Sequence, residues 1–302
     1  MHLWLRAEIH DEDTRAALSP GAAAELLATG FRISVEHSDS RIFPDAAYAD
    51  AGCAIVPNGS WPDAPAEAII LGLDELPEAD IPLRHRHIFA VPAGTGDSFA
   101  ARAAAGGGTI HDLNRMRADL PALDYWTGFT GAAITLRGWA MQIMGEDEIS
   151  LAPAPDAQSL SDDTRADLNA TLLPRPQARI IGAETTIGQG AADLCAALGV
   201  TLAAEAEIVL NCRPDTATQY DGARIIGDLA FSGAPGDLAM RLGADAGDWD
   251  MPFSAPGAAW VMALDTLPAL LPHEFSRDFS AQILPLLGDF DAPIWAAAKP
   301  GQ

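Results

Sequence analysis

The sequence predicts an α/β protein with two Rossmann-like halves, and three observations favour this class. Short apolar runs alternate with helical stretches along most of the chain, which is typical of parallel strands covered by helices. Between residues 179 and 198 an apolar run, a glycine-bearing turn and an alanine-rich stretch follow one another, as in dinucleotide-binding folds. The 302 residues are enough for two domains, each with its own core.

The first half of the chain begins with a predicted strand at residues 2–6, which lacks the long apolar core of a signal peptide. Ser19 is the expected N-cap of a helix that starts at Pro20 and runs to about residue 28, because proline is favoured at the first helical position. The other expected elements of this half are strands at 32–36, 53–56, 68–73, 87–91 and 109–113, and helices at 46–51 and 99–105.

The second half opens on the longest helical candidate, Trp126 to Met144, whose glycines and alanines would allow close helix packing. Residues 145–165 are rich in Gly, Asp, Pro and Ser and are expected to form a loop with one helical turn at most. The remaining expected elements are strands at 179–182, 207–212, 223–229 and 259–263, and helices at 188–198 and 273–287.

Composition excludes several classes of function. The net charge of −24 disfavours nucleic-acid and anionic-membrane partners, because phosphate contacts need a basic surface. No run of about 18 apolar residues is present, so no membrane helix is expected. Three cysteines do not make a disulfide framework, and the cytoplasm is the expected compartment. Lys299 is the only lysine, so any neutral amine base would have to be this residue.

The glycine-bearing turn is the expected cofactor site, with Gly182, Thr185, Gly188 and Gly190 as the candidate cofactor-binding residues. In a functional dinucleotide-binding motif, the middle glycine of the turn lets the backbone approach the pyrophosphate of the dinucleotide. Thr185 stands at that position, and Glu184 adds a carboxylate where phosphates would lie. The architecture of the turn is therefore present, while its cofactor chemistry is altered.

Two further groups of polar residues are less specific indications of a binding site. An acid about 20 residues past the turn usually binds the ribose hydroxyls; Glu205 or Glu207 could serve, although a solvated position in a shortened connection is favoured. His85 and His87 could suggest a metal or a proton relay. No cysteine or acid nearby has ligand spacing, so no metal site is expected and a surface turn before a strand is favoured.

The chain resembles the NAD-dependent, lysine-forming saccharopine dehydrogenases along nearly its whole length. No single motif carries the resemblance. The matching blocks occur in order at residues 2–8, 15–20, 51–53, 59–61, 64–65, 69–73, 75–77, 106–109, 112–113, 125–126, 128–129, 131–133, 265, 267–268, 270–272 and 292–295.

The resemblance implies two Rossmann-like domains with the site in a cleft between them, and a fold related to that of alanine dehydrogenase. It implies a substrate-side domain of residues 1–125 plus 267–302 and a dinucleotide-binding-like domain of residues 126–266. In that family a hydride passes between NAD and saccharopine, giving lysine and 2-oxoglutarate. NAD is therefore the implied cofactor, and an amino-acid-like small molecule is the implied ligand.

The family's proton-transfer residues are replaced at the matching positions. Asp74 stands where the resemblance implies the catalytic lysine, and Pro92 where it implies the histidine. Pro92 cannot carry a proton, so the candidate proton carriers are Asp74, the adjacent Glu75, and His10 at the position of an earlier lysine. Three matching positions near the implied substrate pocket are kept, Arg15, Glu75 and Asp265.

Each of these candidates has a plainer interpretation. Arg15 could clamp a substrate carboxylate in bidentate fashion, or could neutralise the acidic residues 11–13 beside it. Glu75 with Asp74 could form an acid–base pair with one raised pKa, or could lie at a solvated strand end.

Two hypotheses of function follow. The chain is either an NAD-linked oxidoreductase of this family, on an altered amino-acid or opine-like substrate, or a catalytically silent relative. The silent relative would bind a small ligand or a partner, as a homo-oligomer or together with an active counterpart. The loss of general acid–base groups favours the second hypothesis, because each such group typically contributes ~10² to 10⁴ in rate.

Overall fold

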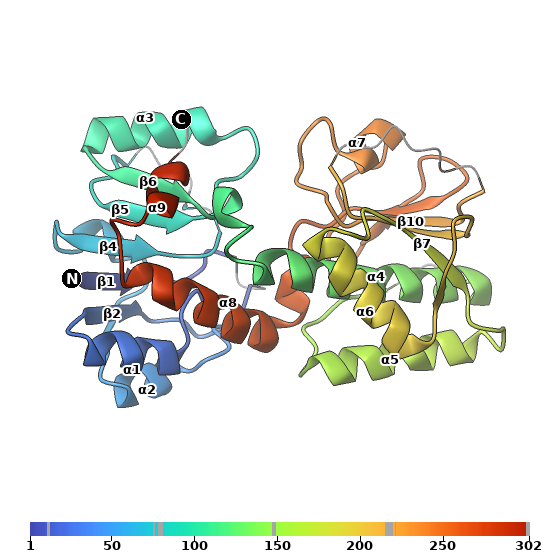
Figure 1. Cartoon of the computed structure of the whole chain (residues 1–302), viewed down its shortest axis with the longest axis horizontal. Helices are drawn as coiled ribbons and strands as arrows, with labels where there is room; N and C mark the ends of the chain where they lie inside the picture. Colours follow the sequence, from blue (N-terminus) through green and yellow to red (C-terminus); the bar gives the residue numbers. More distant parts are fainter. Residues whose placement is uncertain are drawn as a thin grey trace. The chain divides into compact units, whose positions relative to one another are not determined.

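The computed structural model describes residues 1–10, 13–74, 76–77, 81–146, 149–214, 220 and 222–299 (Figure 1). The chain is an α/β protein with two Rossmann-like sheets, as the alternation of strands and helices predicts. It divides into two compact units: unit 1 comprises residues 1–122 and 272–302, and unit 2 comprises residues 123–271.

Unit 1 is built on sheet A, a six-stranded parallel sheet in the order β3-β2-β1-β4-β5-β6. Every residue of the neighbouring strands β1 and β4 is buried, so both faces of the sheet are covered, as expected for a parallel sheet. The strands are β1 (His2–Leu5), β2 (Arg32–Glu36), β3 (Ala54–Val56), β4 (Ala68–Leu71), β5 (Arg86–Phe89) and β6 (Thr109–Asp112).

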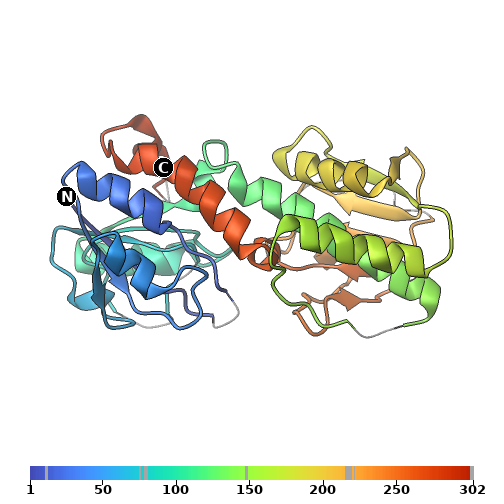
Figure 2. The same ribbon diagram turned by 90° about the horizontal axis from the view of Figure 1, so that it is seen from below.

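The C-terminal segment completes unit 1. Helix α8 (Pro272–Leu287) packs beside α1 (Pro20–Ala28), as Figures 1 and 2 show. The Oγ atoms of Ser276 and Ser280 accept hydrogen bonds of 2.8 Å from backbone amides of the segment that leads into α1. The other helices of the unit are α2 (Asp45–Asp50), α3 (Gly96–Gly106), α9 (Pro293–Ala297) and the short helices η1 (Trp61–Asp63) and η2 (Leu113–Met116).

Unit 2 is built on sheet B, in the order β11-β12-β10-β9-β7-β8. All its pairs are parallel except that of β11 with β12. The strands are β7 (Gln177–Ile181), β8 (Thr201–Leu202), β9 (Ile208–Asn211), β10 (Ile225–Asp228), β11 (Phe253–Ser254) and β12 (Trp260–Met262). The helices are α4 (Ala122–Met144), α5 (Ala157–Ala170), α6 (Thr186–Leu198), α7 (Leu238–Leu242) and η3 (Leu267–Leu270).

Helix α4 packs closely on its neighbours through glycines, which confirms the role expected from its small residues. A Cβ on Gly128 would overlap the carbonyl of Ile187 in α6, and one on Gly131 would lie 2.6 Å from the side chain of Leu229. Although α4 has 23 residues, no helix in the described part of the chain combines the length and apolar character needed to cross a membrane.

Two expectations from the sequence are wrong. Residues 157–170 form the four-turn helix α5 rather than a loop; Asp156 caps it, and its side chain accepts the amide of Ser159 at 2.7 Å. His85 and His87 do not lie in a surface turn. Both are buried, at 4% and 1% exposure, because β5 begins at Arg86 and runs through the covered sheet.

The cysteines behave as small core residues. Cys53, Cys195 and Cys212 are buried and free. Burial raises the pKa of the Cys195 thiol to about 12, so this side chain is not poised as a nucleophile.

Candidate functional site

Sheets of this kind bind ligands outside the carboxyl ends of their strands, where the strand order reverses. In sheet A this point lies between β1 and β4, and in sheet B between β7 and β9. The segments that leave these strands carry most of the candidate residues. Arg6 to Arg15 follow β1 and Gly72 to Asp74 follow β4, while Gly182 follows β7 and Arg213 follows β9.

At the edge of sheet A, Arg15 is held by two carboxylates of the chain itself. Its Nε and Nη2 donate to the two oxygens of Asp13 at 2.8 and 2.7 Å, and Nη2 also donates to Oδ2 of Asp74 at 2.5 Å. Phe275 lies under the guanidinium, 4.9 Å from the ring centroid to Cζ. Arg15 is only 6% exposed, whereas the side chain of Asp74 is 26% exposed. Asp74 therefore covers the solvent side of the arginine.

The backbone around Asp74 is fixed by a second ion pair, Arg6 with Glu8. Arg6 donates from Nη2 to Oε2 of Glu8 at 3.1 Å and to the carbonyl of Asp74 at 2.6 Å. Glu8 accepts the amides of Leu73 and Asp74 at 2.8 and 3.1 Å. Gly72 is needed here, because a Cβ would lie 2.5 Å from Nη2 of Arg6.

The two carboxyls that flank Arg15 differ in proton affinity. Burial would raise the pKa of Asp13, but the charge and hydrogen bonds of Arg15 hold it well below its usual range. The pKa of Asp74 is raised well above its usual value, because burial and the nearby Asp13 and Glu8 outweigh the attraction of Arg15. Asp13 is thus the more acidic partner of Arg15, and Asp74 is the carboxyl of the two that takes up a proton more readily.

Two further positions of this unit that the resemblance implied for proton transfer, His10 and Pro92, lie within the described residues. His10 is exposed, and its carbonyl accepts the amide of Asp13 at 3.0 Å. Pro92 is half-buried, and its carbonyl accepts Oγ1 of Thr95 at 2.8 Å. Glu75 lies outside the described residues. Of the two interpretations of Arg15, the geometry matches neutralisation of a neighbouring acid, since the bidentate pair is with Asp13.

In unit 2 the predicted strand, glycine turn and helix are present in that order. Gly182 has φ +83°, a left-handed conformation that favours glycine. Thr185 is the N-cap of α6: its Oγ1 accepts the amide of Gly188 at 3.0 Å and donates to the carbonyl of Gly182 at 2.7 Å. The threonine side chain thus satisfies one of the helix N–H groups that a phosphate would otherwise use.

The other two glycines serve close packing. A Cβ on Gly188 would overlap the carbonyl of Gly182, and one on Gly190 would overlap the carbonyl of Tyr125 in α4. Arg213 lies over the turn, since a Cβ on Gly182 would be 2.6 Å from its Cγ, and its guanidinium forms an ion pair with Glu184. A side-chain ion pair therefore lies beside the expected phosphate position.

The connection that should carry a ribose-binding acid is short. β8 has two residues, and residues 203–207 lead directly to β9 without a helix. Glu205 is exposed, and Glu207 pairs with Arg224 at 3.2 Å across the start of β9. Both glutamates precede β9, so they lie toward its amino end rather than beside the glycine turn.

Asp265 is exposed in the segment after β12, and it belongs to a different unit from Arg15. Within the described residues no group of three or more His, Cys, Asp or Glu side chains could hold a metal ion.

Sequence reasoning missed several residues at these edges. Arg6 and Glu8 belong to the network around Arg15, and Arg213 covers the glycine turn. Asp228 is fully buried at the end of β10, where it accepts Nδ2 of Asn211 at 2.8 Å and the amide of Ala239 at 2.8 Å. These residues share one feature that the sequence shows. Each is a charged or amide side chain at the end of a buried strand or just after it.

Comparison with known proteins gives matches of three kinds. A family model described as "Alanine dehydrogenase/PNT, N-terminal domain" matches residues 4–130. Saccharopine dehydrogenase [NAD(+), L-lysine-forming] of Schizosaccharomyces pombe is 31% identical over 99% of this chain and 96% of its own length, and that of Yarrowia lipolytica is 32% identical over 98% and 95%. The aligned lengths, 354 and 351 residues, exceed the 302 residues of this chain, so the alignments contain many gaps on its side.

Two solved structures share the fold. An L-alanine dehydrogenase superposes with a TM-score of 0.74 over 100% of this chain and 95% of that chain, at 15% identity. A transhydrogenase from Sinorhizobium meliloti superposes with a TM-score of 0.63 over 99% and 98%, also at 15% identity.

Proposed function

Because this chain belongs to the saccharopine dehydrogenase family, we propose that it is a catalytically silent relative, which keeps the family scaffold but does not oxidise saccharopine. The observation that carries the proposal is the ion pair between Asp74 and Arg15. The resemblance implies a lysine at position 74 and a substrate-side role for Arg15. In this chain the residue at position 74 instead supplies a carboxylate to that arginine.

This pairing affects both binding and chemistry. An incoming carboxylate would have to displace Asp74 from a buried guanidinium that already has two acidic partners. Replacing a lysine by an aspartate also removes an amine that could lose and regain a proton as an imine forms and hydrolyses. Pro92 at the implied histidine position offers no compensating group.

The glycine turn supports the same proposal. NAD is the family's cofactor, but the space beside Gly182 is taken by Arg213, and Gly188 and Gly190 face carbonyl groups of the chain itself. The side chain of Thr185 and the ion pair of Glu184 with Arg213 do not fit such a ligand as they stand.

A specific observation favours a second candidate function, that of an NAD-linked oxidoreductase on an altered amino-acid-like substrate. The raised pKa of Asp74 is what a carboxyl needs to act as a general acid or base nearer neutral pH. In that case Asp74 would be the proton carrier and Arg15 would position it.

The test is NADH oxidation by the purified full chain with L-lysine and 2-oxoglutarate, beside the Schizosaccharomyces pombe relative. If the chain is catalytically silent, we expect a rate at least about 10⁴-fold below that of the relative, since two proton-transfer groups are absent. A rate within about tenfold of the relative would refute the proposal. A weaker rate that Asp74→Asn abolishes would favour the second candidate.

We also propose that the scaffold acts by binding a small amino-acid-like ligand or a partner, either a second copy of the chain or an active relative. Size-exclusion chromatography with light scattering, alone and with a purified saccharopine dehydrogenase from the same cells, tests the partner form. A chain that stays monomeric in both samples would exclude it.

A further inference from the structure

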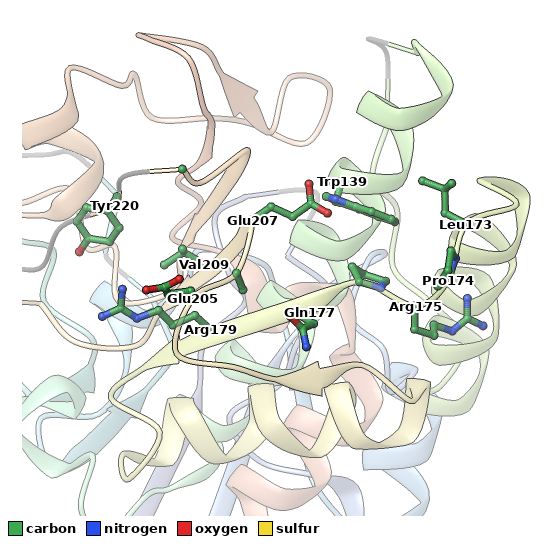
Figure 3. Close-up of a pocket in the computed structure, with 13 residues that line it drawn as sticks. Trp139, Leu173, Pro174, Arg175, Gln177, Arg179, Glu205, Glu207, Val209 and Tyr220 are labelled. Carbon is green, nitrogen blue, oxygen red and sulfur yellow. The ribbon is translucent and has the colours of Figure 1, made fainter.

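Unit 2 has a cavity of about 780 Å³, lined in part by Glu205 and Glu207, that is separate from the strand ends described above (Figure 3). It lies at the amino end of sheet B, against the face of β7 and β9 that carries Arg179 and Val209. Residues 173–177 and 205–207 form part of its wall, together with Trp139 and Tyr220. The glycine turn follows the opposite end of β7, so the cavity is separate from the expected cofactor position.

The short connection between β8 and β9 explains why this space is open. Parallel strands are usually joined by a crossover of a dozen or more residues that contains a helix. Here residues 203–207 join them, and five residues cannot form a helix that would cover the sheet. Helix α6 packs on β7 from the other side, below the strand in Figure 3, and leaves Arg179 facing the cavity.

Trp139 brings an unsatisfied donor to the wall. The side chain is 2% exposed, and its indole Nε1 has no hydrogen-bond partner among the described residues. Figure 3 shows the nitrogen edge of the indole turned toward Glu207. A buried N–H without an acceptor is costly, and such groups are rare in native proteins.

The charges that face the cavity are balanced. Arg179 is half-buried and has no hydrogen bond or ion pair within the described part of the chain. Glu205 is exposed at the rim, and Glu207 shares its carboxylate with Arg224. Arg175 already has hydrogen-bond partners outside the cavity: it donates to the carbonyl of Leu198 at 3.1 Å and to the side chain of Asn169 at 2.6 Å.

We propose that this cavity binds a zwitterionic metabolite of the amino-acid type. Its carboxylate would accept hydrogen bonds from Arg179, and its ammonium group would lie between Glu205 and Glu207. A simple anion would face the two glutamates, and a simple cation would face Arg179, so a ligand with both charges fits best. The volume is in the ordinary range for small-molecule sites and admits an amino acid with a long or conjugated side chain.

Isothermal titration of the full chain tests this with the proteinogenic L-amino acids, each at millimolar concentration, and with acetate and methylamine as single-charge controls. At least one amino acid should bind saturably, and neither control should. Arg179→Gln and Glu205→Gln should each weaken that dissociation constant by about 10- to 100-fold, the loss expected for one charge-assisted hydrogen bond. Trp139→Phe, which removes only the N–H and part of the ring, should weaken it less.

Matched variants at the glycine turn serve as controls, since Arg213→Gln and Glu184→Gln change an exposed arginine and an exposed glutamate of the same unit. They should leave the dissociation constant unchanged. The proposal is overturned if no amino acid binds, if acetate binds as tightly as the amino acids, or if Arg179→Gln and Glu205→Gln bind like the parent protein. Glu205 is exposed, so its glutamine variant gives an answer even where Trp139→Phe does not fold.

Discussion

At the scale of single residues, the pair of acids on Arg15 determines what the edge of sheet A can do. Asp13 satisfies the guanidinium in bidentate fashion, and Asp74 adds a third charge-assisted hydrogen bond from the solvent side. A buried arginine needs a charged partner, and Asp13 is close to it in sequence. Asp74 is 59 positions away, so only the fold brings it there.

The two acids should therefore respond differently to replacement by asparagine. Asp13→Asn removes the ionised partner of a buried arginine and should cost about 3–5 kcal/mol of unfolding free energy. Asp74→Asn keeps an acceptor for Arg15 and resembles the protonated acid, so near neutral pH it should cost far less. Urea denaturation of both variants measures the difference, and equal losses would contradict the assignment of the proton to Asp74.

The raised pKa of Asp74 also gives a pH dependence with a definite sign. The folded protein holds this proton more tightly than the unfolded chain, so its stabilising contribution is complete below about pH 4 and is lost as pH rises through the folded pKa. Relative to the parent, Asp74→Asn should therefore gain stability between about pH 5 and about pH 8. A stability difference that stays constant over this range would show that the pKa of Asp74 is not raised.

His87 predicts a loss of stability in acid. It is 1% exposed, and neither ring nitrogen has a partner among the described residues. Burial, with the nearby His85, lowers its pKa from 6.5 to about 3. A lowered histidine pKa means that the unfolded chain binds the proton more tightly, so stability falls as pH drops from 6.5 toward 3.

Replacing His87 by phenylalanine should flatten this acid-side decline, and replacing the exposed His10 by glutamine should not. Thermal unfolding midpoints between about pH 4 and about pH 7 measure both effects. If the His87 variant lost stability in acid as steeply as the parent, His87 would not be the group responsible.

At the scale of elements, sequence patterns located most strands and helices to within a few residues but missed α5. Its buried side chains are Leu160, Ser161, Thr164 and Leu168, so the stripe facing the core is narrow and half polar. Apolar periodicity is weak in such a helix. Asp156, its N-cap, was the one available signal.

The glycines of the turn are needed for the packing of α6 whether or not a coenzyme binds. Gly190→Ala should destabilise the protein by about 1–3 kcal/mol, because its Cβ would overlap the carbonyl of Tyr125 and push α6 away from α4. Gly257→Ala is the control, since a Cβ there meets nothing within 4 Å. Equal unfolding free energies for the two variants would contradict the close α4–α6 contact.

At the scale of the whole molecule, the α/β class follows from the alternation of strands and helices, and the family follows from matches spread along the chain. The sequence did not reveal which charged residues meet. Arg15 with Asp74, and Arg213 with Glu184, depend on the strand order and on side-chain reach. These pairs are nevertheless the features on which the proposed loss of activity rests.

Our central proposal is a family scaffold that persists without the coenzyme-linked reaction. An assay of turnover depends on the choice of substrate, whereas every reaction of the family needs its coenzyme. The most direct measurement is therefore a fluorescence titration of the purified full chain with NADH. The account predicts no saturable signal at micromolar NADH, and improved binding in Thr185→Gly with Glu184→Ala. Saturable micromolar binding by the unaltered chain would contradict it.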